Sequence, residues 1–336
     1  MKQKRPEASF RKIVNMVHVS LLPSIVDKSL DLGLFESLTE PMGADELADK
    51  MMLDKSVLES LLDVLVSGEY LKESGGKYSL ESVSSDFLVK SSPFYQGDYI
   101  KKLLKESGLA DSISRALTDG PGKFDSKAFC RAEVLKQFGE VAKTGSMQDL
   151  SDFAMSLPGF ENMTSVCDVA GSYGYMAMGL LEVNPNLKGC VYDLPEVAEL
   201  AKDFIKEAGY SDRFESRGFD LAAGDSFGEG YDIVIASNCL HMFDDSVLKG
   251  FYKKLYESLN DGGVFISCHL DMDAEGDDLI TETVKELMVR AYGVKTHHMP
   301  VKEMKSNLES VGFKIEKVRP GKESSFFNIN ILAARK

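Results

Sequence analysis

The sequence has no long apolar run and no recognisable leader segment. None of its apolar stretches approaches the roughly 18 residues that a membrane helix needs. The N-terminal stretch MKQKRPEASFRK is basic, but the apolar segment that a secretory signal requires does not follow it. We therefore expect a cytoplasmic protein without a membrane partner.

Paired cysteine motifs are also lacking. The chain has five cysteines, and no two of them have CxxC spacing. No zinc site, other metal site or redox motif is therefore predicted. Four of the cysteines lie in or beside apolar, strand-like runs, where we expect small core side chains in a reducing compartment: Cys167, Cys190, Cys239 and Cys268.

Positive charge is scarce. The formal net charge is −14, and no run contains five or more consecutive lysines and arginines. An acidic chain of this kind repels the phosphate backbone of nucleic acids. The charge balance therefore argues against a nucleic acid partner.

What is present indicates two domains in the 336 residues. Helical periodicity covers residues 10–33, with a kink expected at Pro23, and continues in 44–52 and 56–71. Ser56 and Glu59 have the spacing of a capping box. A hairpin pattern around Gly75-Gly76 completes a winged-helix layout, which we assign to residues 1–92.

The winged-helix layout is compatible with either a DNA-binding regulator or a dimerisation module. The segment 56–71, where a recognition helix would lie, contains no lysine or arginine and carries three acidic residues. A helix that enters a DNA groove needs donors to bases and phosphates. We therefore favour a homodimer, with helices such as 10–33 burying apolar faces, over a ligand-sensing regulator without catalytic activity.

Residues 93–160 are predicted to form a helical linker that lines the active site, and 161–336 a second domain. In this second domain short apolar strands alternate with helices, which is typical of a doubly wound α/β sheet. The expected strands are 164–170, 189–194, 231–237 and 262–269, and a late pair, 311–319 and 325–335, is expected as the antiparallel edge.

The first of these strands ends in a glycine-containing loop that leads into a helix. The loop contains Asp168, Gly171 and Gly174. Glycines let backbone N–H groups approach a ligand closely, and a helix N-terminus favours a negative group. The loop therefore suits a nucleotide or an amino-acid carboxylate, although a tight packing turn would need the same residues.

Two further strand ends carry acidic residues. Asp193 ends the second strand, where a carboxylate can accept hydrogen bonds from ribose hydroxyls, although it could instead cap the following helix. Asp220 and Leu221 precede the strand 231–237, where an acid and an apolar side chain could contact adenine. Asp225 competes for that role on spacing alone.

Histidines supply the candidates for proton transfer. His241 follows the strand 231–237 and is expected to face the cleft at its carboxyl end, where an imidazole can act near neutral pH. His297 and His298 form a second pair with no metal-ligand spacing around them. They line a ligand pocket or lie at the surface.

Several motifs together resemble the plant caffeic-acid-type and bacterial small-molecule O-methyltransferases, from about residue 12 to residue 335. That family combines a winged-helix dimerisation domain with a class I methyltransferase domain. The stretches that carry the resemblance are GFENMTSVCDVAGSYG, CVYDLPEV, DRFESRGFD, NCLHMFDD, LNDGGVFI and LESVGFKI.

The resemblance implies S-adenosyl-L-methionine as cofactor and assigns a role to several residues. His241 matches the general base. The cofactor contacts that it implies, together with the acid at the start of the glycine loop, are Ser146, Asp168, Gly171, Gly174, Asp193, Leu194, Asp220, Leu221 and Ser237. It also favours Asp220 over Asp225 as the adenine contact.

The chain departs from the family pattern at two places. Ala170 and Ser172 stand where glycines are usual, so a positive φ at either position would be strained. The family's acidic partner for the histidine is not matched, because Thr296, His297 and His298 stand in its place. What orients His241 is therefore not evident from the sequence.

We therefore expect a methyltransferase acting on a hydroxyl of a small aromatic or heteroaromatic molecule, such as a phenol, a polyketide or a hydroxybenzimidazole. Methylation of carbon or nitrogen is the nearest alternative. A nicotinamide-dependent oxidoreductase is disfavoured because the loop reads GSYGYMA and not GxGxxG. The predicted acceptor contacts are Met147, Met288, Tyr292, His297 and His298.

Overall fold

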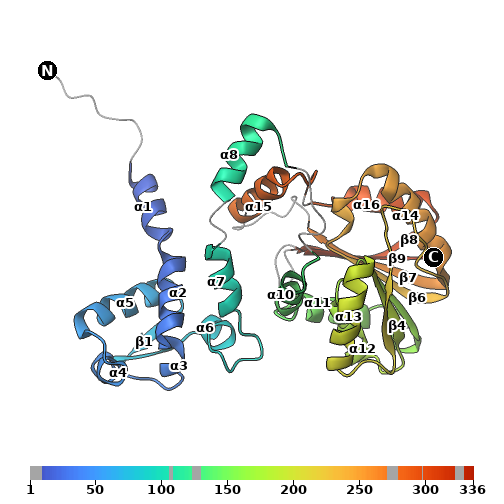
Figure 1. The fold of residues 1–336 in the computed structure, drawn as a ribbon. Coiled ribbons are helices and arrows are strands. Elements are labelled where there is room, and N and C mark those ends of the chain that lie inside the picture. Colours follow the sequence, from blue (N-terminus) through green and yellow to red (C-terminus); the bar gives the residue numbers. More distant parts are fainter. Residues whose placement is uncertain (1–9, 106–108, 123–129, 271–278, 297, 322–328) are drawn as a thin grey trace. The chain divides into compact units, whose positions relative to one another are not determined.

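The computed structural model describes residues 10–105, 109–122, 130–270, 279–296, 298–321 and 329–336 (Figure 1). The chain divides into two compact units, residues 1–107 and 108–336. Across the described ranges, every helix is too short or too polar to cross a bilayer.

The first unit is a helical domain with a two-stranded antiparallel sheet. Its core is formed by apolar side chains such as Leu30, Phe35 and Leu62, which are almost completely buried. The elements are α1 (Arg11–Val19), α2 (Leu22–Leu32), α3 (Leu34–Ser37), α4 (Ala44–Met51), α5 (Lys55–Ser67), β1 (Leu71–Ser74), β2 (Lys77–Leu80), α6 (Ser82–Phe87) and α7 (Gly97–Lys105).

Residues 10–33 form two helices and not one kinked helix. α1 ends at Val19 and α2 begins at Leu22, which places Pro23 in the first turn of α2. Proline is tolerated there because the first N–H groups of a helix have no intrahelical partner. The prediction of a kink at Pro23 was therefore wrong.

The helix α5 begins earlier than the capping pattern suggested. Its N-cap is Asp54, whose carboxylate accepts the Val57 N–H at 2.9 Å. Ser56 consequently lies inside the first turn and does not cap the helix. Aspartate competes well for this position because its charge also interacts favourably with the helix dipole.

The second unit begins with helices and continues into the sheet. The helices before the sheet are α8 (Leu109–Asp119), α10 (Ala132–Ala142), α11 (Ser146–Met155) and the 3₁₀ turn η1 (Phe160–Asn162). The strands are β3 (Ser165–Val169), β4 (Lys188–Asp193), β5 (Phe214–Gly218), β6 (Tyr231–Ser237), β7 (Leu259–Leu270), β8 (Lys314–Arg319) and β9 (Ile329–Arg335). The remaining elements are α12 (Tyr175–Val183), α13 (Pro195–Glu207), η2 (Leu240–Met242), α14 (Asp245–Ser258), α15 (Leu279–Ala291) and α16 (Val301–Ser310).

Over the described residues, seven strands pair in the order β5-β4-β3-β6-β7-β9-β8. All neighbouring pairs up to β7 are parallel, and β9 runs antiparallel between β7 and β8. This arrangement confirms the doubly wound sheet with an antiparallel strand near one edge. β5 was not predicted as a strand, because it is short, polar and placed at the opposite edge.

Helices cover both faces of this sheet and create two separate cores. α11, α12 and α13 pack in one hydrophobic cluster, and α14, η2 and α16 pack in the other (Figure 1). The cysteines expected in the core are buried there, which confirms their structural role: Cys167, Cys190, Cys239 and Cys268.

The parallel strands bring the predicted site residues to one edge of the sheet. β3, β4, β5 and β6 all end at this edge, and Asp193 lies opposite Gly218 in the register of β4 and β5. Ser237 ends β6 and pairs with Cys268 of β7. Ligands of doubly wound sheets bind in the crevice at these carboxyl ends.

Candidate functional site

The loop after β3 adopts a left-handed backbone at positions where glycine is absent. Ala170 has φ = 51° and Ser172 has φ = 56°, and Gly174 follows with φ = 80°. Side chains with a Cβ are strained in this region. The strain expected if Ala170 and Ser172 replaced glycines at positive φ is therefore present in the structure.

The two glycines of this loop are required by close packing. A Cβ at Gly171 would lie 2.3 Å from Cγ of Asp168. A Cβ at Gly174 would lie 2.5 Å from the ring of Phe214, and the backbone there already needs a positive φ to begin α12. A Cβ at either position would overlap a neighbouring side chain, so the backbone packs closely at both glycines.

Asp168 is a buried carboxyl group at the start of this loop. Its Oδ2 accepts the Ala177 N–H at 3.3 Å, whereas its Oδ1 has no hydrogen-bond partner among the described residues. The Oγ of Ser172 is also buried and without such a partner. One carboxyl oxygen and one hydroxyl that are buried without a partner among the described residues fit a ligand that carries a cation and polar hydrogens, as S-adenosylmethionine does.

Burial raises the pKa of Asp168 to about 7, and the negative charge of Asp193 acts in the same direction. Between about pH 4 and pH 7 the folded protein retains a proton that the unfolded chain has lost. This group therefore lowers the free energy of unfolding by about 1.4 kcal/mol per pH unit across that window as the pH rises.

Replacing Asp168 by asparagine should remove this contribution. We expect the free energy of unfolding of the wild type, minus that of Asp168→Asn, to fall as the pH rises from 5 to 7 and to level off near pH 8. Urea denaturation of both proteins at matched pH measures this difference in the free energy of unfolding. The contributions of the other titrating groups cancel because both proteins contain them. A difference that does not change with pH would contradict the assignment.

Asp193, at the end of β4, accepts hydrogen bonds from the glycine loop and from the residue that follows it. Its Oδ2 accepts the Ser172 N–H at 2.7 Å and its Oδ1 accepts the Leu194 N–H at 2.8 Å. Burial raises the pKa of this carboxyl group, while the two backbone N–H groups lower it. An ionised carboxylate still has lone pairs for further donors, such as ribose hydroxyls.

The loop after β5 holds the predicted adenine pair. Oδ1 of Asp220 accepts the N–H groups of Ala222 and Ala223, and Leu221 is buried. Asp225, the competing acid, is exposed and accepts the Asp220 N–H through its own carboxylate. Asp220 is therefore the more enclosed of the two acids.

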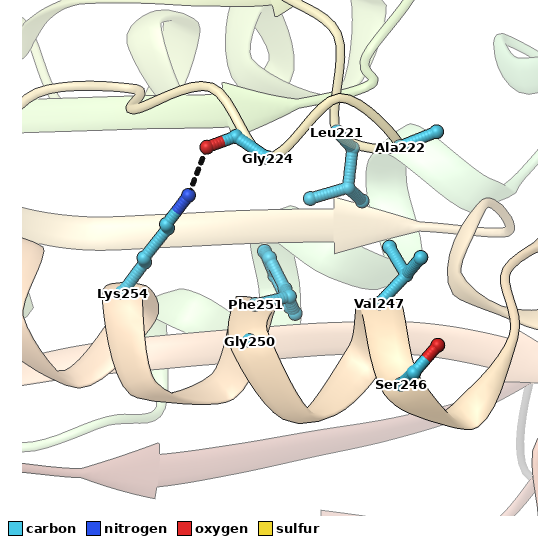
Figure 2. Close-up of a pocket in the computed structure, with 8 residues that line it drawn as sticks. All are labelled: Leu221, Ala222, Gly224, Ser246, Val247, Gly250, Phe251 and Lys254. Atoms are coloured by element: carbon cyan, nitrogen blue, oxygen red, sulfur yellow. Dashed lines mark hydrogen bonds between the residues drawn. The ribbon is translucent and has the colours of Figure 1, made fainter.

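A cavity of about 240 Å³ lies between this loop and α14 (Figure 2). Leu221 points toward Val247 of α14, and the Lys254 ammonium group donates to the Gly224 carbonyl at the other end. Of the predicted site residues, Leu221 is the one that lines this cavity. We therefore place the candidate site at the strand ends and not in this cavity.

His241 lies in η2, directly after β6. Its side chain is 7% exposed, and Asn238 before it has φ = 49°. Ser237 is half-buried at the end of β6. The backbone N–H groups of residues 239 and 240 donate to Nε2 of His269, on β7. Sequence reasoning missed His269, since its strand pattern indicates only a buried position.

Ser146 and Met147 begin α11, on the α12 side of the sheet. Both are buried, and Oγ of Ser146 donates to the Ala142 carbonyl at 3.1 Å. Met147 belongs to the hydrophobic cluster that contains Tyr173 and Tyr175, which follow the glycine loop. α11 packs against α12, the helix into which the loop leads.

The remaining acceptor candidates lie after β7. Met288 and Tyr292 come from α15 and the residue after it, and α15 packs against α8. His298 is buried, and its Nε2 lies 3.6 Å from Oε2 of Glu286, an acid that the sequence analysis did not single out. His297 lies outside the described residues.

The described part of the chain contains no cluster of three or more potential metal ligands. The chemistry gathered at the sheet edge consists of two carboxyl groups, Asp168 and Asp193, and the imidazole of His241. Such an arrangement can bind a polar cofactor and move a proton.

Comparison with known proteins identifies the family. Residues 125–314 match the model of the O-methyltransferase domain, and residues 14–90 match that of the O-methyltransferase dimerisation domain. The chain is 28% identical over 252 residues to 3-hydroxy-5-methyl-1-naphthoate 3-O-methyltransferase of Streptomyces sahachiroi, covering 73% of this chain and 72% of that protein. It is 23% identical over 324 residues to the N,N-dimethyltransferase OxyT of Streptomyces rimosus, covering 92% of each.

Solved structures share the fold. An O-methyltransferase family protein from Burkholderia thailandensis superposes with a TM-score of 0.73 at 17% identity, covering 98% of this chain and 99% of that one. Human N-acetylserotonin methyltransferase, solved in complex with S-adenosylmethionine, gives 0.66 at 21% identity, covering 100% of this chain and 99% of that one. On the family match across more than half of its length, this chain belongs to the S-adenosylmethionine-dependent O-methyltransferase family.

Proposed function

We propose that this protein methylates a hydroxyl group of a small aromatic or heteroaromatic molecule, with His241 as the general base. The observation that carries the proposal is the placement of His241, a buried imidazole beyond the carboxyl end of β6. It shares that sheet edge with Asp168 and Asp193. Histidine is the side chain best suited to accept a proton near neutral pH.

The cofactor would be held by residues of the strand ends. The Asp193 carboxylate accepts hydrogen bonds from the ribose hydroxyls, and Leu194 and Leu221 pack on the adenine ring. Asp220 accepts a hydrogen bond from the adenine amine. The other proposed contacts, which hold the methionine end or border it, are Ser146, Asp168, Gly171, Gly174 and Ser237. S-adenosylmethionine supplies an electrophilic methyl group when it is bound.

His241 takes the proton from the acceptor hydroxyl, so that the oxygen becomes a better nucleophile. A phenol suits this arrangement because its pKa near 10 requires only modest help from a base. Met147, Met288, Tyr292, His297 and His298 are the proposed acceptor contacts. Supporting evidence is the similarity to the naphthoate O-methyltransferase, whose name describes an aromatic hydroxyl acceptor.

Methylation of nitrogen is the second candidate, because the chain resembles the N,N-dimethyltransferase OxyT over most of its length. The acceptor atom can be identified by offering matched hydroxy-aryl and amino-aryl compounds and determining by mass spectrometry which of them is methylated. An amino-aryl product alone would overturn the assignment to oxygen.

We also propose that the protein is a homodimer. α1 carries no buried side chain within its own chain, although Phe10, Ile13, Met16 and Val17 are apolar and more than half exposed. Apolar faces of this kind are expected to be covered by a partner. Analytical ultracentrifugation tests the proposal, and a monomer at micromolar concentration would contradict it.

The experiment that tests the proposed function is a calorimetric titration with S-adenosylhomocysteine, with NADH as the control ligand. We expect about one site per chain and no heat with NADH. A screen of phenolic acceptors with labelled cofactor follows, with His241→Ala as the blank. Failure to bind S-adenosylhomocysteine, both alone and with phenolic ligands present, would overturn the proposal.

A further inference from the structure

His269 contacts the segment that carries the proposed base. It lies on β7, its side chain is 3% exposed, and it pairs in register with Asn330 of β9. Its Nε2 accepts the Leu240 N–H at 3.1 Å and the Cys239 N–H at 3.3 Å. One ring nitrogen of His269 therefore receives two successive backbone donors.

These two N–H groups stand at the start of η2, where backbone donors have no partner within the helix. The N-cap residue of η2 is Cys239, and it makes no side-chain capping hydrogen bond. The imidazole of His269 reaches across from the neighbouring strand and takes this role. A buried N–H without an acceptor is destabilising, so the contact stabilises the turn.

The same contacts determine the protonation state of the ring. A nitrogen that accepts two N–H donors must present its lone pair, so Nε2 carries no proton. The proton of the neutral ring then resides on Nδ1, which lies 2.7 Å from Oγ of Ser267. In this tautomer, which the two backbone donors require, the Ser267 hydroxyl oxygen can accept the Nδ1 proton.

The position of His241 depends on this turn. His241 directly follows Leu240, and the rings of His241 and His269 are 6.5 Å apart between centroids, with their planes at 79°. Movement of the 239–240 backbone would carry the His241 ring with it. A general base must lie within hydrogen-bond reach of the proton it removes, so small displacements lower the rate.

We propose that His269 is a positioning residue for this reaction: it holds the η2 turn through two backbone hydrogen bonds and thereby fixes the placement of His241. The inference rests on the proposed role of His241. It requires the neutral Nδ1–H tautomer of His269, which the two backbone donors to Nε2 impose and whose proton the Ser267 hydroxyl can accept. A neutral imidazole provides this acceptor in a buried place without adding a charge that would have to be desolvated.

The test compares His269→Leu, which removes the acceptor, with His269→Gln, whose amide oxygen can replace it. For His269→Leu we expect amide hydrogen exchange at Cys239 and Leu240 to accelerate about tenfold or more. We expect kcat to fall about tenfold or more, with KM for the acceptor and the Kd for S-adenosylhomocysteine changed by less than about threefold. His269→Gln should recover most of both losses.

His18→Leu is the matched control, because His18 is an exposed histidine on α1 whose Nδ1 pairs with the Val14 carbonyl. Ser267→Ala covers the case in which His269→Leu does not fold. It leaves the imidazole ring in place but removes the hydroxyl that contacts Nδ1. We therefore expect faster amide exchange at Cys239 and Leu240 and a lower kcat, both by smaller factors than in His269→Leu.

The outcomes separate this inference from the proposed function. If His241→Ala is inactive while His269→Leu keeps wild-type kcat and amide exchange, the positioning role is wrong and the proposed function stands. If His241→Ala keeps full turnover, the base assignment fails, whereas faster exchange in His269→Leu would still establish the capping contact. A folded Ser267→Ala variant with wild-type kcat and exchange would overturn the role of the Ser267 hydroxyl in holding the His269 ring.

Discussion

Replacing His241 with alanine is expected to lower kcat by about 10²- to 10⁴-fold, because a positioned base contributes this much to proton transfer. The Kd for S-adenosylhomocysteine should change by less than about threefold, since the imidazole acts on the acceptor and not on the cofactor. Steady-state kinetics with a phenolic acceptor and calorimetry on the same preparations measure the two quantities.

The pH dependence separates a missing base from a damaged fold. A phenol ionises by itself as the pH approaches 10, so the deficit of His241→Ala should narrow between pH 7 and pH 9.5. His18→Ala, at an exposed position on α1, controls for the loss of an imidazole. Full turnover of His241→Ala under saturating cofactor would contradict the proposed role of His241 as the general base.

Replacing Asp193 with alanine is expected to weaken binding of S-adenosylhomocysteine by about 10²- to 10³-fold. The carboxylate holds the N–H groups of Ser172 and Leu194, and the proposed ribose contacts would be lost as well. Hydrogen bonds to a charged group are worth about 1.5–3 kcal/mol each, and 1.4 kcal/mol is a factor of ten in affinity.

Two further variants make this result specific. Asp203→Ala removes an exposed acid on α13, the helix that follows β4, and should bind S-adenosylhomocysteine like the wild type. Asp193→Asn keeps one acceptor oxygen and should lose less affinity than Asp193→Ala. Unchanged binding by Asp193→Ala would mean that the cofactor is not held at the end of β4.

The core of the fold could be predicted because its signals are local. Short apolar runs marked β3, β4, β6 and β7, and their alternation with helices indicated the doubly wound sheet. β5 gave no such signal, because an edge strand buries few side chains and tolerates polar ones. The break in residues 10–33 was placed wrongly, since proline fits a first helical turn as well as a kink.

The candidate site was predictable to the extent that chain order determines it. Strands that run parallel end at one edge, so chain order alone assigns Asp168, Asp193 and His241 to a common region. The motifs also pointed to the family that the O-methyltransferase model identifies. Strand order and motifs do not predict contacts between residues that are far apart in the chain.

The sequence by itself therefore determined the sheet, the strand-end residues and the family, because periodicity and motif spacing are properties of short segments. Only the tertiary structure decided what surrounds them. It placed His269 against the turn of His241, 28 residues earlier in the chain, and Glu286 beside His298. It also set Ala170 and Ser172 at positive φ, because the packing of the loop overrides the local preference of those residues.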